Sequence, residues 1–182
     1  MKLFVSRRER WLWACAVLVV LVVYLTLGVV RDLLQPLEAS GWGPWLFLSG
    51  CFLVLVFVLT QGMSTMPRWS EIVAGIAIAA VYGFILMSIA KPEERMHLII
   101  YGIVALLIYA ALLERSASGR KVFVSPVVVV MVTTVLGLID ECLQLALPDR
   151  VFDVRDILYD ALAAAIAVTA NASLRWARGL FR

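Results

Sequence analysis

Long apolar runs separated by short polar segments make up most of this chain. Six of these runs are close to the roughly 20 residues that a helix needs to cross the hydrocarbon of a bilayer. They lack the alternation of polar and apolar positions that marks the strands of a membrane barrel, so helices are favoured. We predict transmembrane helices at Trp11–Val30, Pro44–Gln61, Ile72–Ala90, His97–Leu113, Pro126–Leu147 and Asp156–Ala177. The short connections predict one all-α transmembrane domain over residues 1–182.

The composition agrees with an integral membrane protein. Of the 182 residues, 63% are hydrophobic and 16% are charged, and the mean hydropathy is +0.97. A typical soluble domain is nearer half apolar and a quarter charged. The net charge of +3 is small, and we expect no nucleic acid partner. The three cysteines stand singly inside predicted spans and show neither metal nor disulfide spacing.

The basic residues predict the orientation. With six spans and a cytoplasmic N-terminus, eleven of the sixteen lysines and arginines fall on the cytoplasmic side, as the positive-inside rule requires. Both termini are then cytoplasmic. The first span follows Arg7, Arg8 and Arg10 as a signal peptide would. Its apolar run is too long for one and no small-residue cleavage site follows, so we expect a retained helix.

Polar side chains gather at the predicted outer ends of the last three spans. The fourth span opens with His97, and Tyr101 follows one turn later. The fifth span carries Asp140, Glu141 and Gln144 near its end. Asp140 and Gln144 share one helical face, whereas Glu141 is turned about 100° away.

Further charges follow in the next loop and at the start of the sixth span: Arg150, Asp153, Asp156 and Asp160. The three aspartates are spaced by three and four residues, so they share one stripe if the helix begins early enough. Asp140 lies roughly 21 Å from the start of its span, at about 1.5 Å per residue. That depth corresponds to the outer leaflet. Charged groups at this depth usually face a bundle interior or an aqueous cavity and have partners.

These carboxylates repel one another unless Arg150, Arg155, His97, a proton or a bound cation compensates them. Two interpretations stay open. A hydrogen-bond and ion-pair network would hold the last three helices together with no ligand, whereas a polar pocket open to the outer leaflet would bind one. Convergence from three helices at one level favours the pocket. Such oxygens suit Mg²⁺, Ca²⁺ or Mn²⁺, but no tight His/Asp spacing indicates a site, so we predict neither metal nor cofactor.

At these residues the sequence resembles the VanZ-like family of small bacterial membrane proteins. The family pattern places His and then Tyr at the start of one helix, matched here by His97 and Tyr101. Next comes Asp-Glu-x-x-Gln, matched at residues 140–144, and a Pro-x-Arg loop, matched at 148–150. Aspartates then lead into a helix rich in small residues, where Asp160 stands at a position that is usually Asn in the family. The resemblance covers about residues 93–170.

The family is named after a protein associated with teicoplanin resistance. The resemblance therefore implies a multi-pass protein of the bacterial cytoplasmic (inner) membrane that contributes to low-level teicoplanin resistance. We expect the pocket to bind a lipid headgroup, a lipid-linked cell-wall intermediate or a glycopeptide antibiotic. Two alternatives are an enzyme acting on lipid headgroups, with Asp140 or Glu141 as general base, and an accessory subunit of a larger membrane complex. Membrane lipids are expected partners in each case.

Overall fold

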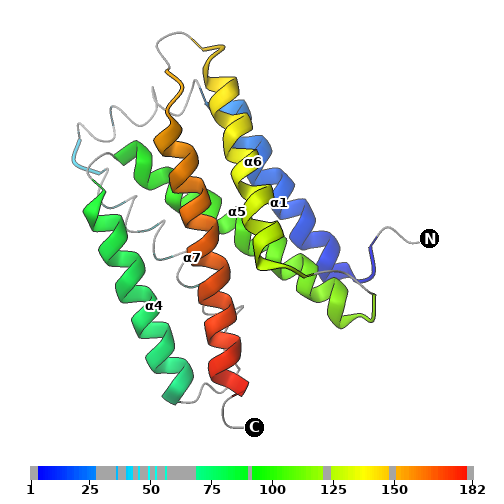
Figure 1. Cartoon of the computed structure of the whole chain (residues 1–182). Helices are drawn as coiled ribbons and strands as arrows, with labels where there is room; N and C mark the ends of the chain where they lie inside the picture. The colour runs from blue at the N-terminus through cyan, green and yellow to red at the C-terminus, as the bar shows by residue number, and fades with distance from the viewer. Residues whose placement is uncertain are drawn as a thin grey trace.

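The computed structural model describes residues 4–27, 69–89, 92–120, 124–147 and 151–179, together with a few isolated positions between 36 and 56. Helices are the regular structure in these ranges, with no strand among the described residues. The all-α prediction is confirmed for them. The helices are α1 (Arg7–Thr26), α4 (Trp69–Ser88), α5 (Pro92–Ala117), α6 (Pro126–Gln144) and α7 (Val154–Gly179) (Figure 1).

Four of these helices are long and apolar enough to cross a membrane, namely α4, α5, α6 and α7. They correspond to the last four predicted spans. The first predicted span corresponds to α1, whose first four residues are all charged and which is not one of these four. Nearly all of the predicted span 44–61 lies outside the described residues. The structure thus supports a helical membrane protein, and the number of six spans stays a prediction.

The starts of α1 and α6 follow from local sequence. Ser6 is the N-cap of α1, and its Oγ accepts the backbone N–H of Glu9 at 2.9 Å. The Glu9 carboxylate in turn accepts the backbone N–H of Val5 at 2.6 Å. This reciprocal pair is close to a capping box and satisfies amides that the helix cannot bond internally. Pro126 opens α6, where its missing N–H has no intrahelical partner to lose.

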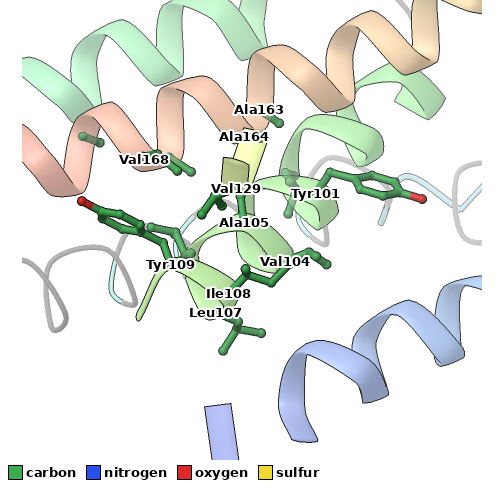
Figure 2. Close-up of a cluster of buried hydrophobic side chains, with 14 of the residues drawn as sticks. Tyr101, Val104, Ala105, Leu107, Ile108, Tyr109, Val129, Ala163, Ala164 and Val168 are labelled. Atoms are coloured by element: carbon green, nitrogen blue, oxygen red, sulfur yellow. The ribbon is translucent and has the colours of Figure 1, made fainter. Parts of the chain in front are cut away.

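The centre of the bundle is α5. It contacts α1, α6 and α7, and α7 also contacts α4 and α6 (Figure 1). Buried side chains of α5 between Tyr101 and Tyr109 meet Val129 of α6 and the small residues Ala163 and Ala164 of α7 (Figure 2). Small residues let helix backbones approach closely, and this packing holds helices together where lipid already solvates apolar side chains.

The outward faces of the bundle are apolar. Large hydrophobic side chains are exposed on several helices, for example Leu25 on α1, Phe84 on α4 and Met131 on α6. An apolar surface of this extent is unusual for a soluble monomer. It is the surface that lipid covers when the helices span a bilayer.

A polar contact joins the start of α1 to the end of α5. Ser6 Oγ donates to Glu114 Oε1 at 2.9 Å, and Arg8 lies 3.7 Å from the other oxygen of Glu114. Arg115 Nε lies 2.6 Å from Oε1 of Glu9, whose side chain is fully buried. The sequence places these charges on one side of the membrane but does not indicate that they touch.

Candidate functional site

Four carboxylates and one histidine meet where α6 ends and where α5 and α7 begin. We call Asp140, Glu141, Asp156, Asp160 and His97 the acidic cluster. Asp140, Glu141 and Asp160 are buried, whereas the side chains of His97 and Asp156 keep 14% and 16% of their exposure. The cluster therefore lies inside the bundle, and His97 and Asp156 form its accessible edge.

His97 links α5 to α7. Its Nδ1 lies 3.0 Å from Oδ1 of Asp160, and its Nε2 lies 3.6 Å from Oδ2 of Asp156. The two aspartates are four residues apart on α7, so their carboxylates lie on one face. Because an ionised carboxylate only accepts hydrogen bonds, Nδ1 carries a proton and donates it to Asp160. The ring of Tyr101 stacks on the imidazole, with centroids 5.8 Å apart and planes inclined by 10°, and this fixes its orientation further.

The adjacent residues Asp140 and Glu141 bond to different helices. The hydroxyl of Tyr101 donates to Asp140 Oδ2 at 2.9 Å and joins α5 to α6. Glu141 accepts from Gln144 Nε2 at 2.9 Å and from the backbone N–H of Asp153 at 2.9 Å, which joins the end of α6 to the start of α7. Glu141 and Gln144 thus lie side by side on α6, and Asp140, Glu141 and Gln144 are all buried.

Asp153 takes a different place from the other two aspartates of its segment. Since α7 begins at Val154, Asp153 precedes the helix, and its carboxylate accepts the N–H of Arg155 at 2.8 Å as an N-cap. The helix thus begins one residue too late for Asp153 to share a stripe with Asp156 and Asp160. Asp153 reaches the cluster through its backbone N–H. Arg150 lies outside the described residues.

Gly137 makes room for Asp160 between α6 and α7. A Cβ at this position would overlap the Asp160 carboxylate and lie 2.8 Å from its Cγ and 3.0 Å from its Cβ. Such distances are too short for carbon atoms, so the two helices approach at this level only because the residue is glycine. Gly137 precedes Asp140 by one turn, and a glycine at such a position inside an apolar span is the one sequence feature that indicates this close packing.

Three members of the cluster also have the arrangement of metal ligands. One ring nitrogen of His97 and one carboxylate oxygen each from Glu141 and Asp156 lie within 4.8 Å of one another. Each residue comes from a different helix. Because the three residues are far apart in the sequence, their spacing does not indicate a metal site, and the prediction from the sequence is that no metal binds.

Taken together, the fold and this cluster define a helical membrane protein with a buried polar centre at one end of its last helices. The family model for VanZ/LLP1 matches residues 11–174. The chain belongs to this family, and the match extends well beyond the 93–170 region that carries the resemblance. No curated protein and no solved structure matches the chain.

Proposed function

We propose that this chain is a VanZ-type protein of the bacterial cytoplasmic membrane whose acidic cluster binds a polar group presented at the outer leaflet. The ligand is a lipid headgroup, a lipid-linked cell-wall intermediate or a glycopeptide antibiotic. Binding of this kind would underlie a contribution to low-level teicoplanin resistance.

The accessible edge of the cluster carries this proposal. Nε2 of His97 lies 3.6 Å from Asp156, beyond hydrogen-bond distance, and makes no hydrogen bond to the residues that the structure describes. A polar group of a ligand fits this position, since a buried donor or acceptor gains from a partner. Asp140 and Glu141, which an enzyme would use as a general base, already accept hydrogen bonds from neighbouring groups. This favours binding over catalysis.

The connections between the described helices support six transmembrane spans. α1 begins beside the end of α5, because Ser6 bonds Glu114, so these two points share one side of the membrane. α5 starts on the opposite side, where a short connection joins it to the end of α4. α1 therefore ends on that opposite side, and α4 begins at Trp69 on the side where α1 begins. This arrangement is the one expected if the predicted span 44–61 crosses the membrane once.

The charges support an outer position for the acidic cluster. The structure describes the side chains of eight arginines. Six of them lie at or near the start of α1, the end of α5 or the end of α7, which share one end of the bundle: Arg7, Arg8, Arg10, Arg115, Arg120 and Arg175. The remaining two, Arg95 and Arg155, lie at the end that holds the cluster. By the positive-inside rule the first end, where α1 begins and α7 ends, is cytoplasmic.

Teicoplanin susceptibility tests the proposal. Cells would carry an empty vector, the wild type, Asp156→Asn or Glu114→Gln, with membrane abundance checked by immunoblot. Glu114 is the control because its carboxylate lies at the opposite end of α5. We expect protection by the wild type and by Glu114→Gln, and none by Asp156→Asn at equal abundance. Absence of protection by abundant wild type would refute the resistance role.

The three ligand sources separate in a second measurement. Protein purified into lipid nanodiscs can be titrated with teicoplanin, while native mass spectrometry of detergent extracts identifies any lipid or lipid-linked intermediate that stays bound. Retention of one species by the wild type and its loss from Asp156→Asn would identify the ligand. Equal retention by both would place the ligand away from the cluster.

A further inference from the structure

A ligand set for a metal ion lies at the accessible edge of the acidic cluster. Its three donor atoms lie within 4.8 Å of one another and come from α5, α6 and α7. Donor atoms bound to one ion at about 2.0–2.2 Å lie at most roughly 4.4 Å apart, so a contraction of a few tenths of an ångström suffices. His97 Nε2 and Asp156 Oδ2 are already 3.6 Å apart, close to the roughly 3.4 Å edge of a tetrahedral site.

Asp160 supplies an independent observation that indicates a cation. Its side chain is fully buried, and its Oδ2 makes no hydrogen bond to the described residues. A buried carboxylate with an unbonded oxygen is costly unless positive charge lies nearby. Its Oδ1 accepts the Nδ1–H of His97, which leaves Nε2 directed at Asp156. Metal-binding histidines usually donate their other ring N–H to a carboxylate in this manner.

We propose that His97 Nε2 and the carboxylates of Glu141 and Asp156 hold a divalent transition-metal ion, Zn²⁺ or Mn²⁺, with Asp160 as the positioning residue for His97. One imidazole nitrogen and two carboxylate oxygens suit these ions. Three protein ligands leave at least one coordination position for an outside group. Because His97 and Asp156 form the accessible edge, an outside group reaches that position from this edge. A phosphate or carboxylate oxygen of the bound headgroup would occupy this position and so reach His97 through the ion and not directly, a step that rests on the proposed function.

Metal titration of the purified protein tests the site. Protein in mild detergent is stripped with EDTA, exchanged into metal-free buffer and titrated with Zn²⁺ by calorimetry, and with Mn²⁺ by the loss of the free-ion EPR signal. We expect one ion per chain. Asp156→Asn should weaken binding at least tenfold, and Glu114→Gln should bind as the wild type does.

Two further variants examine the ligand and the positioning residue. His97→Gln removes the nitrogen ligand and should abolish binding. Asp160→Asn leaves all three ligands in place, and we expect roughly a 10–100-fold loss of affinity, the range typical of a residue that orients a ligand. Size-exclusion chromatography reports folding of each variant. If His97→Gln does not fold, Asp156→Asn decides, since its side chain lies at the accessible edge.

Several results would overturn the metal site. Binding of well under one ion per chain is one, and equal affinity of Asp156→Asn and the wild type is another. In either case the positive charge beside Asp160 comes from a proton on His97. The titration needs no cellular phenotype, so the two proposals fail separately. If the protein binds metal but gives no protection against teicoplanin, the metal site stands and the resistance role is refuted. If the protein protects but binds no metal, the resistance role stands and the metal site is refuted.

Discussion

Gly137 sets how closely α6 and α7 approach at the level of the acidic cluster, and replacing it with alanine tests that packing. The new methyl carbon would lie 2.8 Å from Cγ and 3.0 Å from Cβ of Asp160, where carbon contacts are normally about 3.5–4.0 Å. Asp160 is not free to rotate away, because its Oδ1 is bonded to His97 at 3.0 Å and its Cβ is fixed by the backbone of α7. The helices must therefore separate by roughly 0.5–1 Å.

The expected change in the free energy of unfolding is the difference between two effects. Overpacking of this kind destabilises by about 1–3 kcal/mol, and it also stretches the bond between His97 and Asp160. Alanine in place of glycine inside a helix gains about 0.8–1.0 kcal/mol. The difference is a net loss of up to about 2 kcal/mol. For a chain of this length that lowers the Tm by up to about 8 °C, at roughly 2–4 °C per kcal/mol.

Thermal unfolding of the purified variants in one detergent measures this effect. Gly83→Ala is the matched control, because a Cβ there meets none of the described atoms within 4 Å, and its Tm should equal or exceed that of the wild type. The double variant Gly137→Ala/Asp160→Ala removes Cγ from the contact and should be destabilised by less than the sum of the two single changes. The reasoning is refuted if Gly137→Ala is as stable as Gly83→Ala, or if the double variant shows no such coupling.

Three further predictions concern single hydrogen bonds and charges. Tyr101→Phe removes the donor to the buried Asp140, and thermal unfolding should show a loss of about 1–3 kcal/mol; Tyr109→Phe, whose hydroxyl bonds none of the described residues, should change little. Ser6→Ala removes the N-cap of α1 and its bond to α5, and a loss of about 1 kcal/mol is expected in denaturant titration. Asp160→Asn keeps an oxygen that accepts from His97 and removes a buried charge, so its stability should stay within about 1 kcal/mol of the wild type. A collapse of its Tm would show that the charge itself holds the helices.

The last four spans were predictable because each is a continuous apolar run bounded by polar turns. The ends of these helices were less predictable. The predicted span His97–Leu113 corresponds to α5, which runs from Pro92 to Ala117. The charged residues at both ends continue the helix beyond the apolar region, and apolar periodicity carries no information about them. Ser6 caps α1, and only the structure shows that its side chain also bonds Glu114 of α5.

The meeting of polar residues from three helices was predictable for a simple reason: His97, Asp140 and Asp156 all lie at the same level of a bundle whose loops are short. Their pairing was not predictable. Whether His97 bonds Asp160 or Asp140 depends on the rotation of α5 against α7, which packing of the apolar side chains decides. The role of Gly137 depends on the same rotation. A glycine in an apolar run predicts that another helix packs closely against it, but it does not indicate which helix.

The bond between the start of α1 and the end of α5 bears on how the protein is made. Ser6 and Glu114 are 108 residues apart in the chain, and α6, which α1 also contacts, is synthesised later still. During translation α1 is made before α5 and α6 and at that stage has neither of these neighbours. Its N-terminal cap needs neither of them, because Ser6 and Glu9 accept amides of their own segment. The contact between the start of α1 and the end of α5 therefore forms only after the whole of α5 has been synthesised.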